Sequence, residues 1–215
     1  MSKLSETPPE NLTGNGGGPA SAEFSLEQRR VLLGIAHDAI LSVVGSQGSD
    51  PGERGRVRPS LEAQPSSPQL SEPRGVFTTL YLNHQLRGCV GYAVAVVPLY
   101  RAVAETACAA AFEDSRFVQV TKEEAPQLEV SLSVLSHLFA IRPEAVEVGR
   151  HGLVVSQGTR RGLLLPQVPA EHGWDRETFL EQTCRKAGLP VDAWRKGASI
   201  EAFTAEVFGD VDVAG

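Results

Sequence analysis

Residues 128–135 alternate strictly between apolar and polar side chains, in the order Leu-Glu-Val-Ser-Leu-Ser-Val-Leu. Successive side chains of a β-strand point to opposite faces of its sheet. The segment therefore predicts a strand with one face buried and the other face in contact with water.

Hairpins and helices are predicted both before and after this strand in the sequence. Helices are expected at 26–44, at 99–112 and from Asp175 to Gly188, and the other strands at 76–82, 86–92, 152–156, 162–165 and 200–208. Short turns are expected at Asn83-His84, at Thr121 to Pro126 and around Trp194. Hairpins interleaved with helices, without a regular βαβ rhythm, are typical of the α+β class with a mainly antiparallel sheet and flanking helices.

The domain organisation follows from length and local composition. A chain of 215 residues fits one domain better than two. Residues 1–22 carry few large apolar side chains and predict a disordered tail, which leaves a single domain at 23–210. Within it, residues 45–73 are rich in Gly, Pro and Ser and predict a long loop, either a mobile surface excursion or a crossing of one face of the fold.

Composition restricts the environment and the partners of the chain. The formal net charge is -6, which disfavours binding to nucleic acid or to an anionic membrane. No apolar run approaches the roughly 18 residues of a membrane span, and the N-terminus lacks the apolar core of a secretory signal. Three scattered cysteines indicate a reducing compartment, so we expect a cytoplasmic protein.

The first candidate site is the segment Leu86-Arg87-Gly88-Cys89-Val90-Gly91. Glycine weakens a strand unless another group approaches its backbone closely. Arg87 is expected on the same strand face as Cys89, where its charge would favour the thiolate and make Cys89 a catalytic nucleophile. Alternatively, Cys89 is a small buried hydrophobic residue, and Gly88 and Gly91 mark a β-bulge.

Two further clusters are candidates. Asp114 and Arg116 follow the Ala-rich helix, and they would clamp each other, cap the helix end or present a cation to an anionic ligand. In Arg150-His151 the imidazole acts as a general base or fixes a turn. If Arg87, Arg116 and Arg150 converge, they would bind one small anion.

No metal or cofactor is expected. None of the five histidines stands at a metal-ligand spacing from another histidine or a cysteine. The sequence has no dinucleotide-binding glycine motif, no P-loop and no Gly-x-Ser-x-Gly nucleophile motif.

The chain resembles the AMMECR-type domain family over about residues 24–208. The similar segments are 75–80, 86–91, 110–117, 128–135, 149–153, 161–168, 174–175 and 184–189. Several long motifs in the same order make coincidence implausible. The resemblance implies a larger and a smaller subdomain with a cleft between them, and it makes the Leu-Arg-Gly-Cys-x-Gly segment the family's hallmark.

The resemblance leaves two functions open. Prokaryotic members resemble the first component of the AmmeMemoRadiSam system, which implies a Memo-like protein and a radical SAM protein as partners. The chain is then a binding module, in which a cleft around the hallmark, including Arg87, Asp114 and Arg116, holds a small anionic ligand or docks a partner. The alternative is a Cys89-dependent enzyme that acts on a small anionic substrate, with His151 as a distant base.

Overall fold

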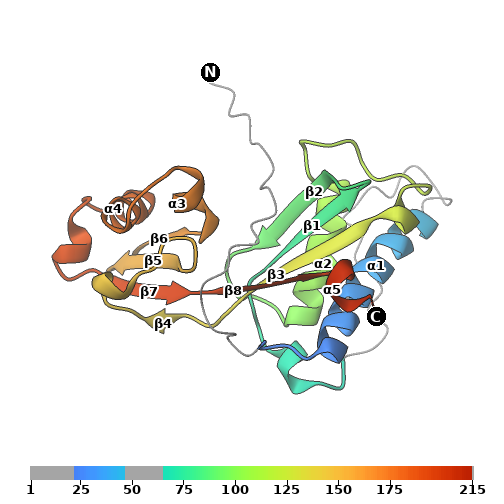
Figure 1. Cartoon of the computed structure of the whole chain (residues 1–215), viewed down its shortest axis with the longest axis horizontal. Helices are drawn as coiled ribbons and strands as arrows, with labels where there is room; N and C mark the ends of the chain where they lie inside the picture. The colour runs from blue at the N-terminus through green and yellow to red at the C-terminus, as the bar shows by residue number, and fades with distance from the viewer. Residues whose placement is uncertain (1–21, 47–64, 215) are drawn as a thin grey trace.

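Two antiparallel sheets, rather than one, organise the chain (Figure 1). The computed structural model describes residues 22–46 and 65–214. Each sheet has four strands and carries its own helices, so the structure has a large lobe and a small lobe. The α+β class and the two-part architecture that the resemblance implied are confirmed.

The large lobe is a sheet of strand order β2-β1-β3-β8. Its elements are α1 (Leu26–Ser46), β1 (Val76–Leu82), β2 (Gln85–Tyr92), α2 (Leu99–Phe112), β3 (Glu129–Leu135), β8 (Ala205–Gly209), α5 (Asp210–Val213) and the 3₁₀ turns Pro68–Ser71 and Ala125–Gln127. α2 packs against β1 and β2, and α1 packs against α2 and β3, so one face of the sheet is covered by helices (Figure 1).

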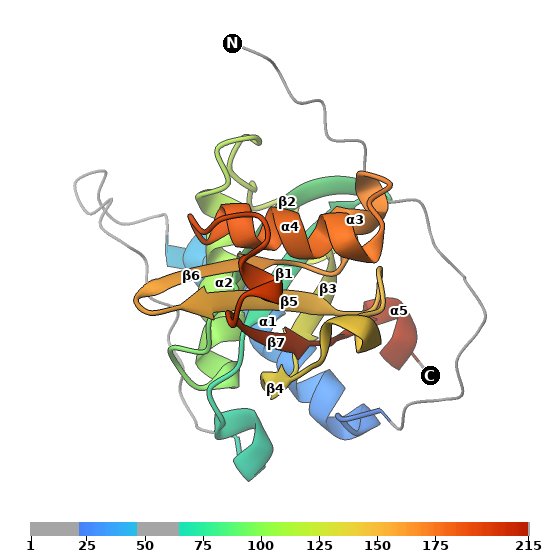
Figure 2. The same cartoon turned by 90° about the vertical axis from the view of Figure 1, so that its left-hand side faces the viewer.

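The small lobe is a sheet of strand order β4-β7-β5-β6 with α4 packed on β5 and β6 (Figure 2). Its elements are β4 (Phe139–Ala140), β5 (Gly152–Gln157), β6 (Arg160–Leu164), α3 (Gln167–Glu171), α4 (Arg176–Lys186), β7 (Ser199–Phe203) and the 3₁₀ turns Pro143–Ala145 and Ala193–Arg195.

Local sequence signals explain several of these boundaries. Asn83 and His84 have φ of 51° and 61°, as a two-residue hairpin turn with the twist of its strands requires. The Asp175 side chain accepts a hydrogen bond from the Thr178 N–H at 2.8 Å and caps α4. The turn predicted at Thr121 is also confirmed, because its hydroxyl and the Glu124 carboxylate each bond the other residue's N–H.

α2 is packed between the sheet and α1, and this close packing requires small side chains on the helix. Ala104 and Cys108 pack with Ala39 and Val43 of α1. On the sheet side, the hydroxyls of Thr106 in α2 and Thr78 in β1 lie 2.7 Å apart and are fully buried. Large side chains on both sides of this helix would hold the two layers apart.

The strand predicted at 200–208 is wrong as a single element. It is divided at Thr204 into β7, which belongs to the small lobe, and β8, which belongs to the large lobe. The chain also crosses between the lobes earlier, after β3, and the two crossings bond to each other, since the Ser136 N–H donates to the Thr204 carbonyl at 2.8 Å. The alternation expected through 200–208 is broken at Ala202 and Phe203, two consecutive apolar residues that are both buried, directly before the change of sheet.

The loop predicted at 45–73 is ordered at its end. Leu70, within the 3₁₀ turn, is fully buried in the core of the large lobe. α1 extends to Ser46, two residues beyond its predicted end. The rest of this loop, 47–64, and nearly all of the predicted tail, 1–21, lie outside the described residues.

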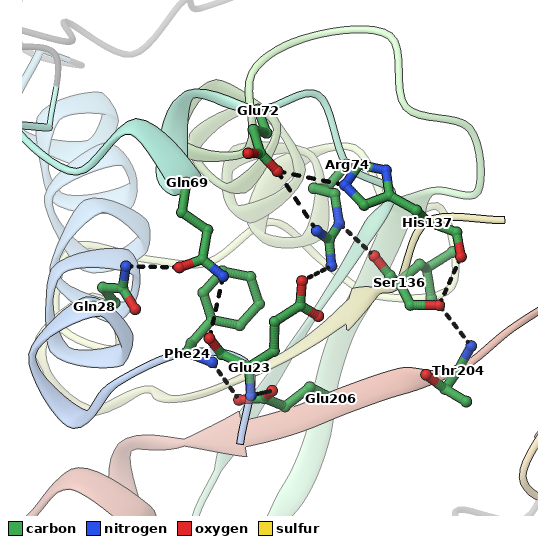
Figure 3. A network of polar contacts seen from close by, with 11 residues as sticks. Glu23, Phe24, Gln28, Gln69, Glu72, Arg74, Ser136, His137, Thr204 and Glu206 are labelled. Carbon is green, nitrogen blue, oxygen red and sulfur yellow. Dashed lines mark hydrogen bonds and ion pairs between the residues drawn. The ribbon is translucent and has the colours of Figure 1, made fainter. Parts of the chain in front are cut away.

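A buried arginine holds the start of the described chain against the lobe junction (Figure 3). Arg74 is 2% exposed, donates to the Leu135 carbonyl at 2.8 Å and bonds the Glu23 carboxylate at 2.6 Å. The Glu206 carboxylate accepts the backbone N–H of Glu23 at 2.6 Å. Sequence patterns gave no sign of this network, because its members are up to 183 positions apart.

None of the helices in residues 22–46 and 65–214 combines the length and the apolar composition that a membrane-spanning helix needs.

A substitution at Gly88 tests the close approach of β2 to α2. A Cβ at Gly88 would overlap the carbonyl oxygen of Ala110, a backbone atom that cannot rotate away. We expect Gly88→Ala to lower the free energy of unfolding by about 1–3 kcal/mol, as overpacking does. Urea denaturation followed by circular dichroism measures the change.

Gly34→Ala is the matched control, because a Cβ at Gly34 in α1 meets no atom within 4 Å. It should stabilise the protein by up to about 1 kcal/mol through helix propensity. Equal effects of the two substitutions would contradict the packing that we describe.

Candidate functional site

A β-bulge places Arg87 outside the ladder of β1 and β2. Leu80 pairs with Gly88 and Tyr81 pairs with Leu86, so Arg87 has no opposite residue. Its guanidinium bonds the Glu124 carboxylate at 2.9 Å and donates to the Val118 carbonyl at 2.6 Å. Arg87 therefore fastens β2 to the segment that follows α2. Among the described residues, no hydrogen bond joins it to the Cys89 thiol.

The two glycines of the hallmark segment are explained by packing. Gly88 lies against the backbone of α2 at Ala110, and the aromatic ring of Phe77 covers Gly91, so a Cβ at either glycine would overlap these atoms. Close approach to the strand backbone is the condition under which glycine is favoured in a strand.

The backbone of Cys89 is held by Asp114 and Arg116. The Cys89 N–H donates to Asp114 Oδ2 at 2.9 Å, and Arg116 Nη2 donates to the Cys89 carbonyl at 3.3 Å. Arg116 also bonds the Asp114 carboxylate at 2.8 Å. β2 is an edge strand, so the ion pair satisfies the two backbone groups that a neighbouring strand would otherwise bond. Of the three roles predicted for this pair, the mutual clamp is observed.

The ion pair controls the ionisation of Asp114. The hydrogen bond from Arg116 is the largest cause, and with the Cys89 N–H it lowers the pKa of the Asp114 carboxyl to about 2. Burial acts in the opposite direction and is outweighed. Arg87 likewise lowers the pKa of Glu124. Both carboxylates are therefore charged partners of an arginine at neutral pH.

The Cys89 side chain lies on the sheet face opposite α2. Thr78 faces α2, so Thr79 and Tyr81 lie on the other face, and Cys89 and Ser131 pair directly with Thr79 on either side. We call the residues Thr79, Tyr81, Cys89, Ser131 and Ser133 the open face. All five are half-buried.

Hydroxyl and thiol groups dominate the open face. The Thr79 hydroxyl donates to Cys89 Sγ at 3.3 Å. Burial raises the pKa of the Tyr81 phenol, and its position beside Cys89 adds to this shift, so the phenol stays neutral at physiological pH. Glu129 pairs with Tyr81 across the strands, but its carboxylate lies 3.5 Å from the exposed imidazole of His84 in the hairpin turn. No carboxylate or imidazole of the described residues bonds the thiol.

Arg150 and His151 lie in the small lobe and bond within their own turn. Arg150 pairs with the Glu147 carboxylate at 3.0 Å. His151 is 6% exposed and its Nδ1 accepts the Glu147 N–H at 3.0 Å. Burial is the main cause that lowers the pKa of His151, so the ring is neutral at pH 7 and fixes the turn. Arg87, Arg116 and Arg150 thus bond three different carboxylates.

A pocket of about 320 Å³ lies between the two lobes. None of the eight predicted site residues lines it. Its walls come from the segments before β1 and after β2, from the crossing after β3, and from β6 and the end of β7. In the described part of the chain, no group of three or more His, Cys, Asp or Glu side chains is arranged to hold a metal ion.

Asp114→Asn tests the clamp on β2. We expect it to lower the free energy of unfolding near neutral pH by about 2 kcal/mol, within the range for hydrogen bonds to a charged group. The folded pKa of about 2 lies below the unfolded value of about 3.9, so the carboxylate stabilises the fold above pH ~4. This contribution is lost as the pH falls toward about 2.

The measurement is a set of urea denaturation curves from about pH 7 to about pH 3. The difference between wild type and Asp114→Asn should be constant above pH ~5 and should shrink below pH ~4. Asp38→Asn, on the exposed side of α1, is the control and should have little effect. A difference that does not depend on pH would exclude the charged clamp.

A sequence model of the AMMECR1 family matches residues 51–208. Protein MK0488 of Methanopyrus kandleri is 38% identical over 204 residues, which cover 90% of this chain and 93% of that protein. Protein MJ0810 of Methanocaldococcus jannaschii is 43% identical over 156 residues, 68% of this chain and 78% of that protein.

A solved structure agrees with these sequence matches. The crystal structure of the uncharacterized protein PH0010 from Pyrococcus horikoshii aligns with a TM-score of 0.56 at 38% identity, and the alignment covers 83% of this chain and 89% of that one. The resemblance stated from the sequence motifs is confirmed, and this chain belongs to the AMMECR1 family.

Proposed function

We propose that this chain is a non-catalytic accessory protein that binds a partner protein over its open face. The family resemblance makes a Memo-like protein and a radical SAM protein the partners to test, in the cytoplasm. The open face is the side of the large-lobe sheet that carries Cys89. The helices α1 and α2 cover the opposite side, so the open face borders solvent and the small lobe.

One observation carries this proposal: the charges of the hallmark region are already paired. Arg87 bonds Glu124, and Arg116 bonds Asp114, so neither cation is available to activate the thiol without breaking an ion pair. Catalytic cysteines are usually activated by a cation, a base, a metal ion or a helix N-terminus beside the thiol. A neutral cluster of hydroxyl groups around Cys89 matches a binding surface better than a catalytic one.

The paired charges also favour a protein partner over a small anionic ligand at this face. An anion would have to compete with Asp114 and Glu124 for the same guanidinium groups. Thr79, Ser131 and Ser133 instead offer neutral donors and acceptors on a sheet, which suit backbone and side-chain amides of a protein.

Co-purification tests the partner proposal directly. We expect a tagged chain to retain the Memo-like or radical SAM protein encoded in the same genome, and Ser131→Arg to abolish retention because a long charged side chain would cover the open face. Ser199→Arg, at an exposed position of β7, should retain the partner as wild type does. Equal retention by both variants, or none by wild type, would refute the proposal.

A Cys89-dependent enzyme is the second candidate. It is favoured by the Thr79 hydroxyl, which donates to Sγ, and by the partial exposure of this thiol. Alkylation of the folded protein, followed by peptide mass spectrometry, discriminates between the two functions. Cys108 and Cys184 are internal controls, because burial raises the pKa of the Cys108 thiol to about 12 and also raises that of Cys184.

We expect Cys89 to be alkylated before the two buried cysteines, at a rate no greater than that of a short cysteine peptide in the same buffer. Such a rate identifies an accessible thiol without special activation. A rate far above the peptide's, maintained in mildly acidic buffer, would identify an activated thiolate and would favour the enzyme.

A further inference from the structure

The pocket between the lobes has apolar walls that come from both lobes. Leu135 and Phe203 are buried at its sides, and Leu163 of β6 lies beside them. The loop that follows β2 adds Ala93, Val94 and Ala95. Pockets that bind small molecules are lined mainly by such side chains, with a few polar groups that fix orientation. A volume of about 320 Å³ is at the lower end of their range.

Because side chains alternate between the two faces of β6, Arg161 lies in this pocket and the neighbouring Arg160 lies on the opposite face of the strand. Leu163 and Arg161 line the pocket. The intervening Gly162 lies against the backbone at the end of α4, at Lys186 and the following Ala187, and Arg160 donates to the Gly188 carbonyl at 2.7 Å. Arg160 and Arg161 therefore lie on opposite faces of the same strand.

Arg161 is the cation of the pocket without an acidic partner. Within 22–46 and 65–214 its guanidinium makes no hydrogen bond or ion pair, although it sits beside apolar walls. Arg74 also lines the pocket, but it is held by Glu23 and by the Leu135 carbonyl. The third basic side chain, His137, lies 3.4 Å from the Glu72 carboxylate (Figure 3).

We propose that this pocket binds a small organic monocarboxylate with an apolar body. The carboxylate pairs with Arg161, whose planar guanidinium matches two carboxylate oxygens, and the body contacts Leu135, Leu163 and Phe203. A single unpaired arginine suits one negative charge. The other arginine of the pocket, Arg74, is already paired with Glu23 and Glu72, so a phosphate ester or a dicarboxylate would find no free cation for its second charge.

This site is separate from the open face and does not depend on the proposed partner. Its ligand would contact β6 and β7 of the small lobe and the crossing after β3 at once. A molecule that binds only the folded arrangement of the two lobes stabilises that arrangement. Binding should therefore raise the temperature of thermal unfolding as well as give a direct signal.

Saturation-transfer NMR with phenylacetate, hexanoate and butyrate tests the proposal on the full chain. We expect phenylacetate or hexanoate to bind more tightly than butyrate, because each buries more apolar surface. Arg161→Gln should weaken binding by about tenfold or more, the usual loss for a hydrogen-bonded charged pair. Arg160→Gln is the matched control and should leave binding unchanged.

Phenylacetamide, which has the same shape without the charge, should bind as weakly to wild type as phenylacetate binds to Arg161→Gln. Ser131→Arg on the open face should bind the carboxylates as wild type does. Loss of carboxylate binding can therefore be distinguished from loss of partner binding. The proposal is overturned if none of the three carboxylates binds, if Arg161→Gln and Arg160→Gln behave alike, or if the amide binds as well as the acid.

Discussion

The close packing of α2 against β2 is the constraint on which the large lobe depends. Gly88 allows the strand backbone to reach the Ala110 carbonyl, and the small side chains of α2 allow α1 to approach from the other side. The segment after α2 then returns along the edge of β2. Asp114, Arg116 and Glu124 are brought to that edge by the position of the helix end, and they fasten the strand there. A shift of α2 would separate all three contacts.

The hallmark segment is therefore explained mostly by architecture. Arg87 holds the returning segment, Gly88 and Gly91 accept close neighbours, and Asp114 with Arg116 bonds the backbone of Cys89 where a neighbouring strand is missing. What architecture does not explain is the Cys89 thiol itself, which lies beside Thr79 on the open face. A motif in which each charge has a structural partner is strong evidence for a shared fold and weak evidence for a shared reaction.

Periodicity and capping residues predicted the elements well, because these signals act over a few residues. The alternation in β3, the turn at Asn83-His84 and the cap at Asp175 all have local causes. The partners of the site residues depend on long-range packing. The bulge at Arg87 and the pairing of Arg74 with Glu23 became visible only in the structure. The open face was partly predictable, since Ser131 and Ser133 were expected to face water.

The same hydrophobic cluster joins the hallmark segment to the pocket between the lobes. Phe77 covers Gly91 in β2 and packs in one cluster with Phe203 and Leu163, which line the pocket. Neighbouring sites usually influence each other through a packed cluster that can switch between two discrete arrangements. Close packing makes small shifts at Phe77 costly, because the ring lies directly on the strand backbone at Gly91. The structure therefore favours a rigid lobe junction, in which an occupant of the pocket reinforces the existing contact between the sheets.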